Sequence, residues 1–267
     1  MNSPAESISW PSRSGFTPLA LNEIHIWATT LDVPPATLEI FSATLSPDEL
    51  ERANRFKSGK LRDRFIAGRG ALRAILAPHL GQSAAALRFT YSDHGKPTLA
   101  EEFAGANLHL NLAHTGDLAL IAVTNVGVVG VDIESIRPIK NVDDLVARFF
   151  SARENELFQQ VPAAEKPAAF FNLWTRKEAL LKATGEGLTG SLSLMEVSFL
   201  PGEPARLLAI SGNRQMGTRW ILRELSPAPG FTGAVAVEGG TINGRPRTPD
   251  EDAAVVVKCW KWNPDFA

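Results

Sequence analysis

The chain has 267 residues, of which 44% are hydrophobic, and its formal net charge is −2. This length allows one large core or two cores of ordinary size. The small net charge gives no general reason to expect a nucleic-acid or membrane partner. The single cysteine, Cys259, excludes a disulfide within the chain and is typical of a reducing compartment, so we expect a cytoplasmic protein.

Residues 1–20 are rich in Ser and Pro and contain neither a basic start nor a long apolar run. This composition predicts a loose N-terminal extension, without a signal peptide or a membrane span.

The sequence contains a degenerate internal repeat, in which the same elements recur at an offset of about 105 to 115 residues. The first half predicts a strand, a capping box, a helix, a strand and a hairpin at 24–29, 46–49, 61–77, 87–91 and 107–124. The second half predicts the same series at 128–134, 151–154, 168–184, 196–200 and 219–238. We therefore expect an α+β fold of two similar halves, 21–126 and 127–267, that form a pseudo-dimer with a ligand cleft between them.

Two carboxylates stand at the end of an apolar, β-branched run that is typical of a buried strand. Side chains of a strand alternate between its faces, so Asp132 and Glu134 point the same way. Two carboxylates on one face repel each other unless a cation lies between them. The alternative is that Glu134 reaches water and Asp132 caps a turn, and the pair alone does not decide.

The predicted helix at 168–184 has an unusual residue in its apolar stripe, which consists of Leu173, Trp174, Leu180 and Leu181. Lys177 falls in the middle of the stripe, and a buried lysine needs an anionic partner. Glu178 and Lys182 lie along the edge four residues apart, where they could simply form a surface ion pair. Together with the acidic strand end, these residues suit a divalent cation that holds a phosphate ester.

The segment from Arg52 to Arg73 is strongly basic, with eight Lys or Arg residues and one acidic residue, Asp63. Part of this set is an ordinary solvated face, but the local excess suggests a surface that binds phosphates. A nucleic-acid surface would require interleaved aromatic residues and a basic domain, which the sequence lacks.

The two signature segments, Gly130-Val131-Asp132-Ile133-Glu134 and the run Trp174 to Leu188 (WTRKEALLKATGEGL), resemble the paired motif of the 4′-phosphopantetheinyl transferases. The length and the two halves resemble the Sfp-type branch rather than the short trimeric synthases. The likeness covers about 46–194 and extends to Gly95-Lys96-Pro97, to 111–116 and to 148–151.

The resemblance implies that coenzyme A donates its phosphopantetheine arm to a serine of an apo carrier protein and leaves as adenosine 3′,5′-bisphosphate. It implies that Asp132, Glu134 and Glu178 hold Mg²⁺, with Mn²⁺ as an alternative, and that Glu178 is the base. Lys182 would stabilise the departing phosphate, with Lys177 close by. The implied contacts to the nucleotide are His114 and Arg64 at its 3′-phosphate, Lys96 and Pro97 beside the adenosine, and Arg52. We also expect a monomer.

The chain departs from the family pattern at several positions. Ala113-His114-Thr115 stands where the family often has Ser-His-Ser, and a lysine-rich stretch of some relatives is replaced by Glu49 to Arg52. Glu154 matches a family glutamate near the metal, but its capping box explains it equally well. The tail after Gly239 lies outside the resemblance.

Two other functions use the same residues. The first is a Mg²⁺-dependent nucleotide or coenzyme A pyrophosphatase that attacks with water, and the second is a catalytically silent protein that holds coenzyme A or a carrier. The presence of both Asp132 and Glu178 argues against the silent protein, and we expect the transferase. The sequence does not identify the carrier, although Phe149, Phe150 and the 185–190 loop are candidates for contact with it.

Overall fold

The computed structural model describes residues 10–185, 192–239, 241–242, 245–246 and 254–263. The chain divides into two compact units. The N-terminal unit contains residues 12–126 and the C-terminal tail from Val255, and the C-terminal unit contains Gly127–Ala254 and the described residues up to Pro11. The chain thus changes unit at 126/127. None of the described helices is long and apolar enough to cross a membrane.

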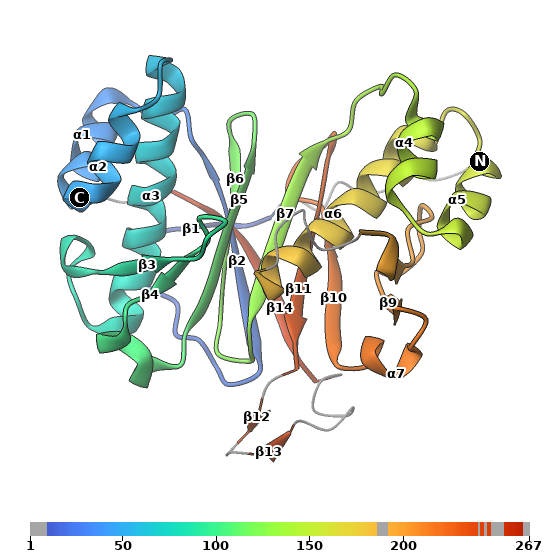
Figure 1. Ribbon diagram of the computed structural model, residues 1–267. Coiled ribbons are helices and arrows are strands. Elements are labelled where there is room, and N and C mark those ends of the chain that lie inside the picture. The colour runs from blue at the N-terminus through green and yellow to red at the C-terminus, as the bar shows by residue number, and fades with distance from the viewer. Residues whose placement is uncertain (1–9, 186–191, 240, 243–244, 247–253, 264–267) are drawn as a thin grey trace. The chain divides into compact units, whose positions relative to one another are not determined.

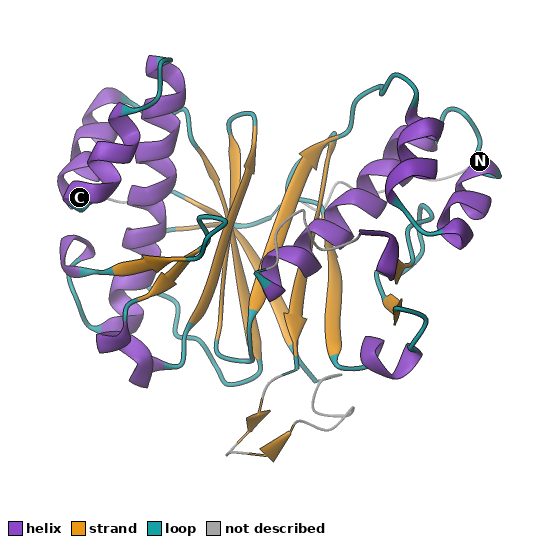
Figure 2. Ribbon diagram, in the orientation of Figure 1, coloured by secondary structure: helices purple, strands orange, loops and turns teal. Residues whose placement is uncertain are grey.

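The N-terminal unit has a five-stranded mixed sheet with the order β1-β14-β2-β6-β5 (Figures 1 and 2). Strands β2 and β6 are antiparallel, as are β6 and β5, whereas β14 runs parallel to β2 and β1 runs parallel to β14. The strands are β1 (Ser12–Arg13), β2 (Glu23–Thr30), β5 (His109–Thr115), β6 (Leu118–Thr124) and β14 (Val256–Trp262), with a separate hairpin of β3 (Phe89–Tyr91) and β4 (Pro97–Leu99). The helices are α1 (Pro35–Thr44), α2 (Pro47–Asn54) and α3 (Gly59–Leu80).

The C-terminal unit has a three-stranded antiparallel sheet with the order β10-β11-β7. Its strands are β7 (Val129–Ser135), β10 (Trp220–Leu225) and β11 (Phe231–Glu238), with two small pairs, β8 (Met195–Val197) with β9 (Leu207–Ile210) and β12 (Thr241–Ile242) with β13 (Arg245–Pro246). Its helices are α4 (Val142–Phe149), α5 (Ala152–Gln159), α6 (Lys166–Thr184) and α7 (Arg214–Gly217). Helix α6 packs across β7 and β11, as Figure 1 shows.

The two units repeat one topology, as the sequence predicts. In each, a long strand leads through three helices and a small pair of strands to a hairpin, with α7 added before the hairpin of the C-terminal unit. The last strand of the hairpin pairs with that long strand (β6 with β2, β11 with β7). Both predicted capping boxes are present, at Ser46–Glu49 and at Ser151–Glu154. The fold class is α+β.

Two expectations about the ends of the chain are wrong. The C-terminal tail does not belong to the C-terminal half, because β14 pairs with β2 and Trp260 stacks on Trp27 with ring centroids 4.7 Å apart. The extension 1–20 is not loose throughout, because Ser12–Arg13 pairs with β14 and Trp10 is buried. A two-residue strand and a strand far along the chain leave little local pattern, which is why the sequence did not predict them.

Candidate active site

The candidate active site depends on a close approach between β7 and α6. A Cβ atom at Gly130 would lie 2.0 Å from the Ala179 carbonyl oxygen and 2.4 Å from the Ala183 amide nitrogen. Only glycine therefore fits at this position, because neither backbone atom can move away without displacing the helix. Asp132, two residues further along β7, lies on the same face as Gly130 and is brought against the same helix.

Lys182 and Asp132 form an ion pair between α6 and β7. The Lys182 Nζ donates to Asp132 Oδ1 over 2.5 Å. The other carboxylate oxygen of Asp132, Oδ2, and the Oε1 atom of Glu178 are buried and have no hydrogen-bond partner among the described residues. Buried carboxylate oxygens normally have a partner, so these two atoms mark a place where a donor or a cation fits.

Burial and mutual repulsion perturb the two carboxyl groups. Burial raises the pKa of Asp132 to about 6, against the opposing effect of the Lys182 ammonium. Burial, followed by the negative charge of Asp132, raises the pKa of Glu178 to about 7. Because the two carboxyl groups interact, the pKa values belong to the coupled pair and not to either residue alone. A carboxyl group that is partly ionised at neutral pH is suited to act as a general base.

Glu134 lies further out on β7 and has a neighbour that the sequence analysis missed. Arg137 Nη1 donates to Glu134 Oε2 over 3.0 Å and also to the Ser135 carbonyl oxygen over 2.9 Å. Its guanidinium lies 4.7 Å above the centroid of the Phe171 ring. A cation three residues after a carboxylate was the available signal, but that spacing is common at the end of a strand and did not single out Arg137.

In the described residues, no group of three or more His, Cys, Asp or Glu side chains is arranged to hold a metal ion. In this structure Asp132 faces Lys182, and Glu134 faces Arg137. The chemistry of the residues nevertheless fits a hard cation. Three carboxylates provide oxygen ligands, and the unpartnered oxygens of Asp132 and Glu178 are buried. The residues thus fit a Mg²⁺ ion that would take the place of the internal cations.

Lys177 has an internal partner, so its burial does not require a ligand. It is fully buried, and its Nζ donates to Glu154 Oε2 over 2.5 Å and to the Leu192 carbonyl oxygen over 2.7 Å. Glu154 also accepts from the backbone N–H groups of Ser151 and Val197. The place of Lys177 close to the phosphate stays a prediction, and Glu154 joins α5, α6 and β8.

Arg64 of the N-terminal unit makes a two-pronged ion pair with Asp32. Its Nε and Nη2 donate to the two Asp32 carboxylate oxygens over 2.6 and 2.8 Å, and its Nη1 donates to the Gly116 carbonyl oxygen over 2.8 Å. The bond to Gly116 places Arg64 at the β5–β6 turn. Gly116 follows His114 by two residues in the sequence, and His114 is exposed. The two residues predicted to share a phosphate are thus near the same turn.

Arg52 and the Gly95–Pro97 turn also come together. A Cβ atom at Gly95 would lie 3.4 Å from Arg52 Nη2, so the guanidinium rests on the turn, and Gly95 has φ of +77°. Burial lowers the pKa of Lys96 to about 8. Pro97, the first residue of β4, is buried. Arg52 therefore lies beside the turn that contains Lys96 and Pro97, whereas Arg64 lies at the β5–β6 turn of the same unit.

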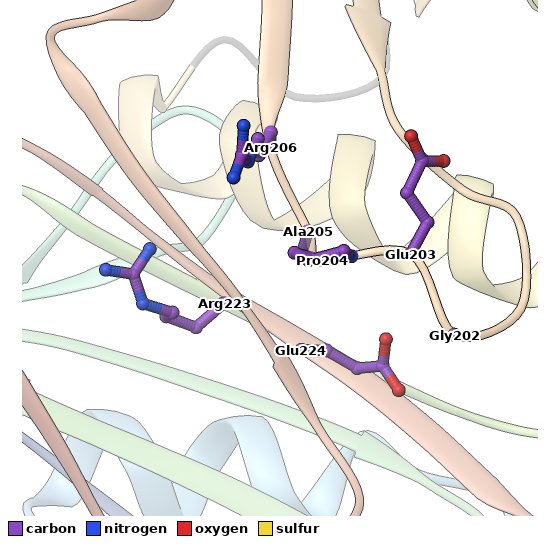
Figure 3. A pocket seen from close by; sticks show the side chains of 7 residues that line it. All are labelled: Gly202, Glu203, Pro204, Ala205, Arg206, Arg223 and Glu224. Atoms are coloured by element: carbon purple, nitrogen blue, oxygen red, sulfur yellow. The ribbon is translucent and has the colours of Figure 1, made fainter.

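A hollow of about 540 Å³ on the C-terminal unit contains none of these residues; it is lined by Gly202, Glu203, Pro204, Ala205, Arg206, Arg223 and Glu224. Figure 3 shows the guanidinium groups on one side of it and the carboxylates on the other. Glu224 is already bound to Arg176, whose Nη2 donates to it over 2.6 Å. The hollow is lined by two glutamates and two arginines. The predicted carrier contact at 185–190 lies, apart from Gly185, outside the described residues.

Comparisons with known proteins give the family. Residues 128–235 match the 4′-phosphopantetheinyl transferase superfamily, and residues 33–126 match the N-terminal region of 4′-phosphopantetheinyl transferases. The chain is 42% identical over 231 residues to the 4′-phosphopantetheinyl transferase HetI of a Nostoc species, a match that covers 86% of this chain and 94% of HetI.

Other similarities are weaker. The chain is 35% identical over 145 residues to the 4′-phosphopantetheinyl transferase AcpT of Salmonella typhimurium, covering 54% of this chain and 70% of AcpT. It is 27% identical over 159 residues to Sfp of Bacillus subtilis, covering 60% of this chain and 68% of Sfp. The holo-[acyl-carrier-protein] synthase structure of Thermotoga maritima gives a TM-score of 0.34 at 21% identity, over 43% of this chain and 64% of that one, which is too low to support a conclusion.

The chain belongs to the 4′-phosphopantetheinyl transferase family, in its two-half, Sfp-type branch. It is therefore an enzyme of phosphopantetheine transfer, and coenzyme A and a carrier protein are the partners that this family uses.

Proposed function

We propose that this enzyme transfers the 4′-phosphopantetheine arm of coenzyme A to a serine hydroxyl of an apo acyl or peptidyl carrier protein in a Mg²⁺-dependent reaction. The observation that carries the proposal is the buried carboxylate pair of Asp132 and Glu178, with Lys182 beside it. In the reaction the serine oxygen forms a bond to the phosphorus next to the pantetheine arm. The bond from that phosphorus to the bridging oxygen breaks, and adenosine 3′,5′-bisphosphate leaves.

Glu178 acts as the general base. Burial raises the pKa of Glu178 to about 7 in the metal-free protein, and a bound divalent cation would lower this pKa. Glu178 is therefore ionised at neutral pH and accepts the serine proton, directly or through a water. A loose transition state for phosphoryl transfer needs the proton removed only late, so a moderate base is sufficient. Lys182 supplies positive charge for the oxygen of the departing phosphate, once its ammonium has turned from Asp132 toward the substrate.

Asp132, Glu134 and Glu178 are the residues that would hold Mg²⁺, or Mn²⁺ in its place. The ion, when bound, neutralises the charge of the pyrophosphate. Arg137 holds Glu134 and Lys182 holds Asp132 in the protein alone, which keeps the carboxylates of β7 paired with internal cations. These two cations also lower the repulsion between neighbouring carboxylates.

The N-terminal unit binds the nucleotide part of coenzyme A. Arg52 and the Lys96–Pro97 turn border the adenosine and a phosphate, and Arg64 and His114 contact the 3′-phosphate. The contact of Arg52 with Gly95 supports this grouping, as does the bond from Arg64 to the β5–β6 turn. Because Arg64 is held by Asp32, it is oriented before the ligand arrives. A monomeric state and a cytoplasmic location remain predictions.

The test is the intact mass of an apo carrier protein after incubation with this enzyme, coenzyme A and MgCl₂, with EDTA in a parallel sample. A metal-dependent gain of one phosphopantetheine unit is expected. If coenzyme A is cleaved while no tested carrier gains mass, the enzyme is a hydrolase. If coenzyme A stays intact as well, the protein only binds its ligands.

A further inference from the structure

Arg69 is a buried cation that the reaction described above does not use. The residue is 8% exposed, and its guanidinium lies 5.5 Å from the centroid of the Phe65 ring and 5.2 Å from that of Tyr91. Its Nη1 atom is buried and has no hydrogen-bond partner among the described residues. A guanidinium group has five N–H donors and cannot lose its charge in a protein, so a buried one normally has an acceptor.

The nearest carboxylate is already taken by another arginine. Arg73 is fully buried and contacts Glu49 Oε2 through Nε at 2.8 Å and Nη2 at 2.6 Å. Arg69 Nε is 4.0 Å from Glu49 Oε1, which also accepts from the Tyr91 hydroxyl over 3.3 Å. Two buried guanidinium groups therefore share one carboxylate. A buried charge without a close counter-ion is costly, so this surplus positive charge favours an anionic ligand.

A second guanidinium group contacts the same aromatic ring as Arg69. Arg52 lies 5.6 Å from the centroid of the same Phe65 ring that Arg69 contacts, and its Nη2 rests on Gly95. Burial lowers the pKa of Arg69, and the positive charges of Arg52 and Arg73 lower it further against the opposing effects of Tyr91 and Glu49, so Arg52 is close enough to act on Arg69. A phosphate group has enough oxygens to accept hydrogen bonds from two planar guanidinium groups at once.

We propose that Arg69, together with Arg52, binds a phosphate group of the nucleotide. The identity of the ligand as the nucleotide part of coenzyme A rests on the proposed function; the demand for an anion rests on Arg69 itself. The phosphate can be the 3′ group or a group on the 5′ side, and adenosine monophosphates that carry one or the other distinguish the two.

The experiment is isothermal titration of adenosine 3′,5′-bisphosphate, adenosine 3′-monophosphate and adenosine 5′-monophosphate into the full chain. Arg69→Gln removes the charge and should weaken binding of the bisphosphate about 10-fold or more, because a charge-assisted hydrogen bond to the phosphate is lost. Arg69→Lys keeps the charge but loses the planar guanidinium group, so its affinity for the bisphosphate should lie between those of the wild type and Arg69→Gln. If Arg69→Gln weakens only one of the two monophosphates together with the bisphosphate, that monophosphate carries the phosphate group that Arg69 binds.

The matched control is Arg62→Gln, which removes an exposed cation of the same helix that is paired with Asp63. It should leave all three affinities unchanged, and thermal unfolding of each variant reports whether the fold is kept. Unchanged affinity of Arg69→Gln for the bisphosphate would overturn the proposal. If Arg69→Gln does not fold, Arg69→Lys decides, and wild-type affinity of that variant would overturn it equally.

A double-mutant cycle with Arg52→Gln adds a readout that a merely structural role would not move. If both arginines hold one phosphate, their effects on affinity are not additive, whereas their effects on thermal unfolding are. Additive losses of affinity would contradict a shared phosphate. The titrations need neither metal nor carrier. If the enzyme transfers phosphopantetheine normally and Arg69 variants bind the nucleotide as the wild type does, only this inference is refuted. If nucleotide binding depends on Arg69 but no transfer occurs, the proposed function is refuted.

Discussion

The long helices α3 and α6 each bury one cation against the glutamate of a capping box, but they differ in what stands next to that pair. In the N-terminal unit, Arg73 contacts Glu49. In the C-terminal unit, Lys177 contacts Glu154. The spacing between glutamate and cation is almost the same, 24 residues and 23 residues. This pair belongs to the repeated architecture.

The difference lies in the added charges. One turn before its structural cation, α3 has a second buried cation, Arg69, where α6 has the apolar Leu173. Directly after its structural cation, α6 has the buried carboxylate Glu178, where α3 has Ala74. The other buried cation of α6, Arg176, is paired with Glu224. The same topology thus carries an additional buried cation in one unit and an additional buried carboxylate in the other, which suits phosphate binding in the first and a base with a metal ion in the second.

Breaking the shared pair should have the largest effect on stability. Lys177→Met leaves the Glu154 carboxylate buried without its cation and should cost about 3–5 kcal/mol in the free energy of unfolding. Arg73→Met should cost at least as much, since Arg73 also donates to two backbone carbonyl oxygens, those of Ala84 and Leu87. Chemical denaturation measures both. The double variant Lys177→Met/Glu154→Gln should regain part of the lost free energy of unfolding. If the losses of the two single variants simply add, Lys177 and Glu154 do not form a direct pair.

Gly130→Ala tests the close approach that the C-terminal site requires. The added methyl group would lie 2.0 Å from the Ala179 carbonyl oxygen, so α6 must move, and the cost should reach about 3 kcal/mol, the upper end of typical overpacking. Transfer activity should be lost even where the protein still folds. Gly59→Ala is the control, because a Cβ atom there meets nothing within 4 Å. Equal stability and activity of the two variants would show that β7 and α6 can separate freely.

The pH dependence of stability should distinguish the units. Because the pKa of Glu178 is raised in the folded state to about 7, the folded protein holds this proton more tightly than the unfolded chain does. Its contribution to stability is present below about pH 4.5 and is lost as the pH rises to about 7. Compared with Glu178→Gln, the metal-free wild type should therefore lose roughly 1–3 kcal/mol between pH 4.5 and 8. Parallel stability curves for the two proteins would mean that Glu178 is not desolvated.

Arg137→Gln should have the smallest effect on stability, and its main effect should be on the Mg²⁺ concentration that the protein requires. Its ion pair with Glu134 is partly exposed, so stability should change by less than about 1 kcal/mol. Release of Glu134 should lower the Mg²⁺ concentration for half-maximal thermal stabilisation about two- to fivefold. Arg153→Gln, at a comparably exposed arginine that lies 4.0 Å from Glu196, is the control. An unchanged or raised Mg²⁺ requirement would mean that Arg137 does not compete for Glu134.

The sequence predicted the order of elements because each carries a local signal. The capping boxes fixed the starts of α2 and α5, and the apolar run before Asp132 fixed β7. The site on β7 and α6 was predictable in composition, since Gly130, Asp132 and Glu178 stand at fixed spacings within two segments. Which lysine faces which carboxylate was not, because Lys177 and Lys182 are both on α6 and only the tertiary packing brings Glu154 to the first and Asp132 to the second.

Two further features lay beyond sequence patterns. The β14 strand pairs with β2 across more than 200 residues of chain, and no local periodicity reports such a partner. The sequence predicted a phosphate-binding surface among the eight basic residues of this segment but did not separate Arg69 from the solvated ones, and only its burial beside Glu49 distinguishes it.

The division of labour between the units is tested most directly by steady-state transfer kinetics of Glu178→Gln and Arg52→Gln, each with nucleotide affinity measured alongside. We expect Glu178→Gln to lower kcat about 100-fold or more while adenosine 3′,5′-bisphosphate binds as in the wild type. Arg52→Gln should raise the KM for coenzyme A and weaken the bisphosphate while kcat at saturation stays close to that of the wild type. If Glu178→Gln lost nucleotide binding, or Arg52→Gln lowered kcat alone, the two units would not divide binding and chemistry in this way.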